Sequence, residues 1–400
     1  MKGAAWHPQR RSALGRVLNL RSLAWLRVEW HVLAMALSLL AIGLVFVRHM
    51  DLADVNFNRD EVHFASHLRK VGLTLPFLFL ALLVRPRWLR RNTWVLYGIA
   101  IALLLLVPVI GEERNHARRW IRLPLPGFDL QPSELAKLGL ILALARVLYT
   151  SRMKTLGEWV RPGLLALLPM ALVALQPDLG TALTIVPVTL GMFYLAGASA
   201  RRLVAIVLLA GLVGLGAWKL ELVRGYQLQR VKTWVAAMDN DALIEGRNGP
   251  AFHTYMGRVS VGNGGWFGTG LGQGVANEAG HLPERDSDSI FAVVAEEAGF
   301  VGTGAIVLLY TSLIAALMIS ASAIRERFTR LVVGGIALYF GAHFFINVGV
   351  NLGLLPMTGL TLPLFSTGGS SLLVSFLALG LALGLAAQQE PTLDQDAFRD

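Results

Sequence analysis

The sequence contains no cysteine, so disulfide bonds, thiolate metal sites and cysteine nucleophiles are all excluded. It is also poor in charge: charged residues make up 16% of the chain, whereas soluble proteins carry about 25%. No phosphate loop of the form G-x-x-x-x-G-K-S/T occurs anywhere in it. Nucleotide hydrolysis is therefore not expected to drive this protein, and a soluble globular fold is disfavoured.

Apolar residues are abundant instead, at 54% of 400 residues. A soluble fold could not bury that much apolar surface, so the sequence predicts an all-α polytopic membrane protein with the bilayer as most of its solvent. A spanning helix needs about 20 mostly apolar residues. The candidate spans are His31–Val47, Leu68–Val84, Thr93–Gly111, Ser133–Tyr149, Pro162–Pro177, Leu179–Ala200, Leu203–Trp218, Val293–Ser322, Leu331–Leu354 and Gly368–Gln389, which makes ten transmembrane helices.

The basic residues set the expected orientation, because short cytoplasmic loops of membrane proteins are enriched in Lys and Arg. Here the N-terminal segment and alternate loops are basic, at residues 85–91, 152–161, 201–202 and 325–330. An even number of spans then places both termini in the cytoplasm. The net charge of +10 is accounted for by topology, so no nucleic-acid partner is expected.

This topology divides the chain into three parts. Residues 1–30 form a cytoplasmic basic segment, in which Leu14–Trp30 is either an amphipathic helix along the inner interface or a plain basic tail. Residues 31–389 form the ten-helix membrane domain, and residues 390–400 form a cytoplasmic tail. Residues 219–292, between the seventh and eighth helices, form a long extracytoplasmic loop, and loops of that length are commonly functional or disordered.

Polar clusters gather on the external side, the first of them before the fourth span. There Arg118 and Arg119 stand beside Trp120, and arginine suits phosphate oxygens. This loop is interpreted as a clamp for an anionic headgroup or pyrophosphate, or else as an unspecific lipid contact. Glu134 and Lys137 are three residues apart, hence on one helix face where they can pair. Such pairs at membrane depth face a cavity or the bundle interior, so the pair is either part of a site or purely structural.

Two further segments allow different interpretations. Asp178 joins two spans in a tight turn, so we expect it at the outer surface, either capping the next helix or lining a site. The glycine-rich segment 262–274 is a weak cue for nucleotide binding, because no strand and helix frame it. Close backbone packing or a mobile loop explains it better.

A group of carboxylates precedes the eighth span, in the sequence LPERDSDSIF that begins at Leu282. Asp288, the last acidic residue before the predicted helix, is the strongest candidate for a general base. An aspartate near the low-dielectric boundary can have its pKa raised toward the working range of such a base. For Glu284 and Asp286 a solvated acidic loop is the simpler interpretation.

The last two spans contribute a polar stripe and an irregular connection. His343, Asn347 and Asn351 recur every four residues, so they share one helix face, and such a face normally meets neighbouring helices rather than lipid. The connection 356–371 contains two prolines and three glycines. Irregular backbone at membrane depth needs protein or water around it, so this connection is expected to be re-entrant. Because every cluster is external, the sequence predicts one shared outward-facing site.

At these residues the chain resembles the SEDS family of RodA/FtsW-type peptidoglycan polymerases. The likeness runs from about Trp30 to Gln388, and the family crosses the membrane ten times. The C-terminal block of this chain, NVGVNLGLLPMTGLTLPLFSTGGSS, resembles the family's C-terminal signature, which is quite specific. The matching blocks are residues 115–121 (NHARRWI), 131–137 (QPSELAK), 176–181 (QPDLGT), 282–297 and 347–371.

The resemblance implies a glycosyltransferase that polymerises lipid II on the outer face of the bacterial cytoplasmic membrane, for cell-wall elongation or division. Its partner would be a class B penicillin-binding protein, the crosslinking transpeptidase, and its ligands would be lipid II and undecaprenyl-linked glycan. The family's essential aspartate falls on Asp288. The expected substrate-binding residues are Arg118, Arg119, Trp120, Glu134, Lys137, Asp178, His343, Asn347, Ser366, Gly368, Gly369 and Ser370.

Asp288 would take the proton of an attacking sugar hydroxyl, and Arg118, Arg119 and Lys137 would stabilise the departing pyrophosphate. No metal site made by the protein is expected and no cofactor is certain. A divalent cation, Mg²⁺ or Mn²⁺, held by oxygen ligands is left open.

The sequence departs from the family pattern at a few places. Asp286-Ser287-Asp288-Ser289 replaces the usual His-Thr-Asp-Phe, His116 stands where glycine is usual, and Thr367 where tyrosine is common. Residues 282–285 slightly favour the elongation branch, whereas GLTLPL at 359–364 is common in the division branch. Two alternative functions stay open: a flippase or transporter of lipid-linked sugar, and a non-catalytic scaffold for a cell-wall synthase.

Overall fold

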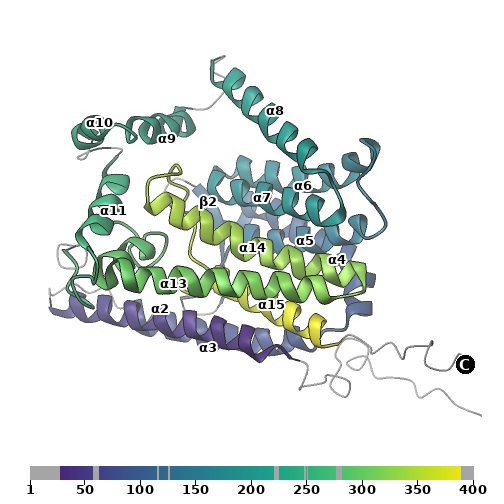
Figure 1. The fold of residues 1–400 in the computed structure, drawn as a ribbon, viewed down its shortest axis with the longest axis horizontal. Helices are drawn as coiled ribbons and strands as arrows, with labels where there is room; N and C mark the ends of the chain where they lie inside the picture. Colours follow the sequence, from purple (N-terminus) through teal and green to yellow (C-terminus); the bar gives the residue numbers. More distant parts are fainter. Residues whose placement is uncertain are drawn as a thin grey trace, which may run out of the picture.

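The structure, a computed structural model, describes residues 28–56, 63–114, 117–124, 127–219, 225–246, 249, 251–275 and 282–388. Its helices are α2 (Trp30–Asn56), α3 (His63–Leu82), α4 (Pro86–Ile110), α5 (Pro132–Leu148), α6 (Gly157–Leu175), α7 (Leu179–Ala196), α8 (Ala200–Lys219), α9 (Gly225–Ala236), α10 (Asn240–Glu245), α11 (Phe252–Asn263), α13 (Ile290–Ala323), α14 (Arg327–Asn351) and α15 (Gly369–Ala387). The long helices lie side by side, and α9, α10 and α11 gather at one end of them (Figure 1).

Each of the ten predicted spans lies on one of the long helices. Among the residues described, six helices are long and apolar enough to cross a membrane, namely α2, α4, α6, α13, α14 and α15. The apolar part of α7, Gly180–Ala196, is shorter. The polytopic helical membrane fold is therefore confirmed at this level.

The centre of the bundle is formed by α14 and α15, since 83% of the apolar window of each is buried. Close approach of backbones makes this packing possible. A Cβ at Gly380 would lie 2.2 Å from the Leu78 carbonyl oxygen of α3, and one at Gly384 would lie 2.1 Å from that of Leu82. Lipid tails are as apolar as the helix surfaces, so the hydrophobic effect does not drive membrane helices together. Small residues let the helices approach closely, and van der Waals contact then stabilises the packing.

The all-α expectation is wrong in one place, because a small antiparallel sheet follows α4. Strand β1 (Glu112–Arg114) pairs with β2 (Ala117–Arg122), and β2 pairs in turn with β3 (Asp129–Leu130). The long apolar runs that identify spans give no signal for a short hairpin. Outside a helix, backbone N–H and C=O groups still need partners, and strand pairing supplies them here.

The segment expected as one long loop contains α9, α10 and α11, and α11 packs on α13. The glycine-rich segment after α11 lies against a break in α13 at Gly299, whose φ is 65°. A Cβ at Gly264 would lie 1.9 Å from the Ala295 carbonyl oxygen, and one at Gly268 would lie 2.1 Å from that of Glu297. Of the two favoured interpretations of this segment, close backbone packing or a mobile loop, close packing is confirmed at these glycines.

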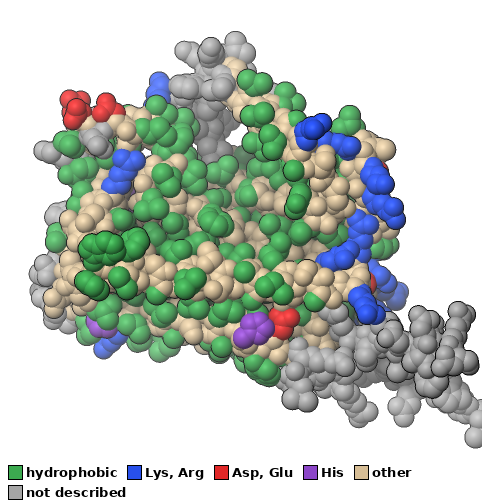
Figure 2. Space-filling view, viewed as in Figure 1, with side chains coloured by type: hydrophobic (Ala, Val, Ile, Leu, Met, Phe, Trp, Pro, Cys, Tyr) green, Lys and Arg blue, Asp and Glu red, His purple; other side chains and the backbone are tan. Residues whose placement is uncertain are grey.

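Charge is distributed unevenly over the surface (Figure 2). Lys and Arg side chains gather at the end of the bundle opposite α9 and α10, and hydrophobic side chains cover much of the helical face between the two ends. This distribution agrees with the basic loops predicted for one side.

The predicted helix at Leu14–Trp30 lies outside the described residues except for its last three, and His116 and residues 390–400 lie outside them entirely.

Candidate active site

The loop immediately before α13 carries Asp288, and two amides of α14 hold its backbone. Asn347 Nδ2 donates to the Asp288 carbonyl oxygen over 2.9 Å, and Asn351 Nδ2 donates to the same oxygen over 3.0 Å. Both asparagines are buried. The polar stripe predicted for this span does face neighbouring elements, and it fixes the position of the Asp288 backbone.

The Asp288 carboxyl group is enclosed, with 7% of the residue exposed. Within the described parts of the chain its Oδ1 has no hydrogen-bond partner, and a Cβ at Gly359 would lie 3.7 Å from its Oδ2. Burial first, and then the negative charge of Glu284, raises the pKa of Asp288 to about 7. A carboxyl group with this pKa and an unused oxygen is suited to exchange a proton near neutral pH.

The two atypical residues of this loop have their own partners. Thr367 Oγ1 donates to Asp286 Oδ2 over 2.8 Å, so the residue that replaces the family's tyrosine bonds to the one that replaces its histidine. On the other side, the Ser289 hydroxyl is bonded to Nε2 of His253 in α11. Burial lowers the pKa of His253 to about 4, so its ring is neutral near pH 7. Asp286, Thr367 and Ser289, three of the departures from the family pattern, thus each have a hydrogen-bond partner beside Asp288.

Further contacts tie this loop to α2 and α3. Arg285 forms a buried ion pair with Asp54 of α2, and Lys70 Nζ of α3 donates to the Thr367 carbonyl oxygen over 3.2 Å. The sequence reasoning missed all three charged side chains. A signal was present for Lys70, because a cation inside an otherwise apolar helix is costly unless it is partnered.

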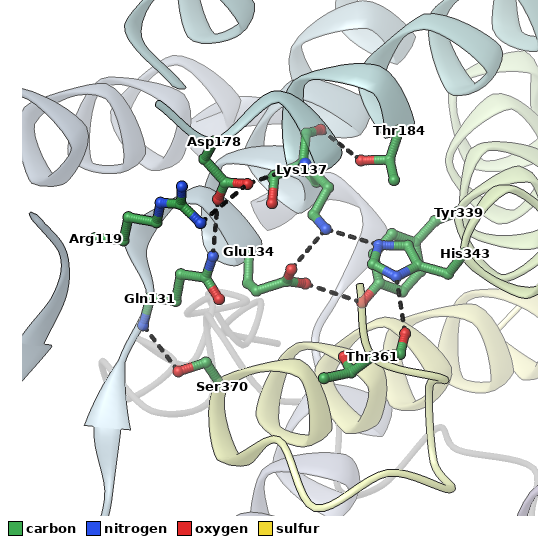
Figure 3. Close-up of polar contacts among 11 residues, drawn as sticks. Arg119, Gln131, Glu134, Lys137, Asp178, Thr184, Tyr339, His343, Thr361 and Ser370 are labelled. Atoms are coloured by element: carbon green, nitrogen blue, oxygen red, sulfur yellow. Dashed lines mark hydrogen bonds and ion pairs between the residues drawn. The ribbon is translucent and has the colours of Figure 1, made fainter. Parts of the chain in front are cut away.

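A second polar cluster is enclosed in the bundle between α5 and α14 (Figure 3). Lys137 Nζ donates to Glu134 Oε1 over 2.7 Å, which confirms the pairing that their spacing predicts. The same Nζ lies 2.6 Å from His343 Nε2, and Tyr339 OH donates to Glu134 Oε2 over 3.4 Å. Because Lys137 has only donors, the neutral His343 ring accepts at Nε2 and carries its proton on Nδ1. Every charge in this cluster is therefore matched by a buried partner.

Asp178 joins a third group at the start of α7 (Figure 3). Its Oδ1 accepts from the Thr181 N–H over 3.2 Å, so the expected helix cap is confirmed. Its Oδ2 accepts from Gln131 Nε2 over 3.1 Å, and Arg119 Nη1 lies 3.9 Å from its Oδ1. These partners bury the carboxylate, with 4% of the residue exposed. The position of this turn at the outer side of the membrane stays a prediction.

The arginine loop is used differently by its two arginines. Arg119 donates from Nε to the Gln176 carbonyl oxygen over 3.2 Å and from Nη2 to that of Pro177, so its fork holds the turn before α7. Arg118 stays exposed, and its Nε lies 3.6 Å from Glu113 Oε2. The Trp120 side chain is half-buried in β2. An anion clamp therefore fits Arg118 better than Arg119.

The small residues of the last connection join the surrounding elements together. Ser366 Oγ donates to the Ser287 carbonyl oxygen, and Ser370 Oγ donates to that of Asp129 over 2.6 Å. The packing between them is close, since a Cβ at Gly368 would lie 2.9 Å from Thr361 Cγ2 and one at Gly369 would lie 3.3 Å from the Phe128 ring. These contacts join the last connection to the loop before α13 and to β3. The part of these residues in substrate binding stays a prediction.

The face of α14 links Asp288 with the buried cluster. Asn347 Nδ2 also donates to the Leu360 carbonyl oxygen over 2.6 Å, and one turn away His343 Nδ1 lies 3.5 Å from that of Thr361. The irregular connection thus packs against the side of α14 that carries both groups. Through these contacts α14 joins the Asp288 loop to the buried Lys137 cluster. Convergence of all the polar clusters on one site stays a prediction.

Arg230 of α9 is a further residue that the sequence reasoning missed. Its positive charge lowers the pKa values of both Asp288 and His253, although burial outweighs this effect on Asp288. Its Nη1 donates to the Met357 carbonyl oxygen over 3.0 Å. No local pattern marks Arg230, because it lies far along the sequence from the groups it faces.

The described residues do not provide a protein-made cation site. In these parts of the chain, no three His, Asp or Glu side chains are grouped so that they could hold a metal ion. The carboxylates around Asp288 are instead spread among separate partners, as Asp286 with Thr367 illustrates.

Comparison with known proteins places this geometry in context. The family model of FtsW/RodA/SpoVE, described as cell cycle proteins, matches residues 29–390. A probable peptidoglycan glycosyltransferase FtsW of Allochromatium vinosum is 33% identical over 366 residues, which cover 89% of each chain. The protein of the same name from Coxiella burnetii is 35% identical and covers 92% of this chain and 98% of its own.

Solved structures agree with this assignment. One, described as the structural coordination of polymerization and crosslinking by a peptidoglycan synthase complex, matches with a TM-score of 0.76 at 32% identity, over 94% of this chain and 100% of that one. The rod shape determining protein RodA of Thermus thermophilus matches with a TM-score of 0.66 at 32% identity, over 94% of this chain and 99% of its own. The chain therefore belongs to the FtsW/RodA/SpoVE family, as its resemblance to the SEDS polymerases predicted.

Proposed function

We propose that this protein is a peptidoglycan glycosyltransferase that polymerises lipid II on the outer face of the bacterial cytoplasmic membrane. The observation that carries the proposal is Asp288: a buried carboxyl group with one unused oxygen and a pKa raised to about 7, beside the loop between α14 and α15. The names of the relatives support the same activity. They support neither the flippase nor the scaffold alternative.

In the proposed step, Asp288 accepts the proton of the 4-hydroxyl of a GlcNAc in the incoming lipid II. That oxygen forms a bond to the anomeric carbon of the growing chain's terminal sugar, with inversion, while the bond from that carbon to the lipid pyrophosphate breaks. One base is sufficient, since pyrophosphate leaves readily when its charge is stabilised. Two arginines supply positive charge for the departing pyrophosphate on the outer side. They are the exposed Arg118, and Arg230, whose charge acts on Asp288. Lys137, fully buried with Glu134 and His343, holds the inner wall of the site.

An apolar groove suits the lipid part of this substrate. It has a volume of about 480 Å³ and is lined by apolar side chains from α3, α4, α5 and α15. Leu135 and Leu138 line it from α5, the helix that carries Glu134 and Lys137 on another face. A polyprenyl chain lying in this groove would bring its pyrophosphate toward the external polar clusters.

The membrane arrangement belongs to the same proposal. Ten spans, α2 to α8 and α13 to α15, would place both termini in the cytoplasm and residues 219–292 outside. A class B penicillin-binding protein is the proposed partner, and the related complex that joins polymerisation to crosslinking supports this choice. The relatives named FtsW favour the division branch over the elongation branch that residues 282–285 slightly favoured.

The test is polymerisation of lipid II by the purified full-length chain with its transpeptidase. Asp288→Asn removes the base and should reduce the rate by about 10²–10⁴-fold. Asp286→Ala should have a mild effect. Asp241→Asn, which removes an exposed carboxylate from α10, serves as the matched control and should leave the rate unchanged. Full activity of Asp288→Asn would exclude this mechanism.

A further inference from the structure

A separate pocket lies at the basic end of the bundle, away from Asp288. Its volume is about 410 Å³, and it is formed where α4, α5 and α6 meet. Trp94 of α4, Arg146 and Tyr149 at the end of α5, and Glu158 and Arg161 at the start of α6 line it. Proteins of this size bind small ligands in pockets of about 300–1,000 Å³, so the volume is sufficient for a headgroup.

Both arginines of the pocket are oriented by aromatic rings. The Arg146 guanidinium lies over the Tyr149 ring, with Cζ 5.2 Å from its centroid, and that of Arg161 lies over Trp94 at 5.8 Å. Among the described residues, neither guanidinium has a hydrogen bond or ion pair. Stacking on a ring leaves the N–H edge of the guanidinium open, and that edge matches phosphate oxygens.

The carboxylate of the pocket, Glu158, is hydrogen-bonded to groups other than the two arginines. Glu158 Oε2 accepts from Ser151 Oγ over 2.6 Å and from the Arg152 N–H over 3.0 Å. Its Oε1 accepts from Thr155 Oγ1 over 3.0 Å. These bonds commit Glu158 to closing the connection between α5 and α6. The pocket keeps an excess of positive charge.

The location points to a lipid source for the anion. Lys and Arg side chains gather at this end of the molecule (Figure 2), which is the cytoplasmic end in the proposed topology. Trp94 is 40% exposed, as is common for tryptophan at a membrane interface. Basic pockets between transmembrane helices on the cytoplasmic side are suited to anionic headgroups. We propose that Arg146 and Arg161 bind the phosphate group of an anionic phospholipid of the inner leaflet.

The proposal rests on the proposed topology for its choice of leaflet, but its test needs neither the topology nor the polymerase activity. Full-length protein is titrated with phosphatidylglycerol or phosphatidylcholine, and bound lipid is counted by native mass spectrometry. The double variant Arg146→Gln/Arg161→Gln should bind phosphatidylglycerol about tenfold more weakly than the original protein. Phosphatidylcholine binding should be unchanged.

Arg201→Gln is the matched control, because it removes an exposed cation of α8 from the same end without touching the pocket. Its affinity should equal that of the original protein. An equal loss in Arg201→Gln would mean unspecific attraction and would overturn the site. Displacement of the lipid by millimolar inorganic phosphate, with no preference between the two phospholipids, would overturn the lipid assignment.

Folding of the double variant is checked by its thermal unfolding, which should match that of the original protein. The variant Arg161→Lys provides a second measurement, because it keeps the charge and loses the planar fork. It should bind phosphatidylglycerol more weakly than the original protein and more tightly than the double variant. Unchanged binding in both variants would contradict the proposal.

Discussion

Three aspartates in the connections before α7 and α13 differ in what their surroundings allow. Asp178 accepts hydrogen bonds from Gln131 and from the Thr181 N–H, so its charge is used to fix the start of α7. Asp286 accepts from the Thr367 hydroxyl. Asp288 keeps an oxygen without a partner in the described parts of the chain. A carboxylate oxygen without a partner is free to accept a proton from a substrate hydroxyl.

The residue scale yields a pH prediction. Because the pKa of Asp288 is raised to about 7, chiefly by burial, and a general base must be deprotonated, kcat/KM should fall as pH drops below about 7. Glu284→Gln removes a negative charge that raises this pKa. The acidic limb of the pH–rate profile should therefore move to lower pH in that variant.

Asp241→Asn is the control for this profile, because this exposed acid of α10 is not among the groups that shift the pKa of Asp288. An acidic limb that stayed fixed in Glu284→Gln would refute the electrostatic explanation.

The pH dependence of stability gives an independent measurement, and its direction follows from the same pKa. The folded protein holds the Asp288 proton up to about pH 7, whereas the unfolded chain releases it near 3.8. The free energy of unfolding should thus decrease as pH rises between these values, and this decrease should be absent in Asp288→Asn.

At the scale of elements, the glycine-rich segment and the break in α13 form one unit. The Phe300 N–H donates to the Gly265 carbonyl oxygen over 2.9 Å, and the Thr269 N–H donates to that of Glu296 over 3.0 Å. The first turns of α13 are thereby held apart from the rest of that helix. This arrangement sets the direction in which α13 leaves the loop that carries Asp288.

Gly268→Ala should disrupt this unit. Its φ is +81° and an added Cβ would lie 2.1 Å from the Glu297 carbonyl oxygen. Left-handed strain costs about 1–2 kcal/mol, and overpacking adds about 1–3 kcal/mol, so thermal unfolding should occur several degrees lower. Gly262→Ala is the matched control, because nothing lies within 4 Å of its added Cβ. Equal melting temperatures for the two variants would show that the close contact carries no energetic weight.

At the scale of the whole molecule, the uneven charge predicts how the bundle sits in the membrane. The absence of cysteine provides a direct test, since one introduced cysteine is the sole thiol in the chain. In right-side-out vesicles, an impermeant maleimide should label Glu113→Cys and Asp241→Cys. It should label Arg91→Cys and Arg201→Cys only after the membrane is permeabilised. Labelling of Arg201→Cys in sealed vesicles would contradict the proposed orientation.

The sequence alone determined the features that depend on local pattern. Apolar runs placed each of the long helices, since a span is defined by its own composition and length. A spacing of three placed Glu134 and Lys137 on one face. The family motif identified Asp288. The sheet after α4 escaped this reasoning, because a short hairpin leaves no such pattern.

Tertiary structure decided which of these groups are neighbours and which remain free. His343 meets Lys137 across 206 positions of sequence, and Arg119 turned out to hold the turn before α7 rather than stand open to a ligand. Arg230 reaches the same region from α9, although no local pattern marks it. Helix periodicity is a property of adjacent residues, whereas burial and partner choice depend on side chains that only folding brings together. For that reason the sequence could name Asp288, and only the fold could bury it and leave its oxygen unused.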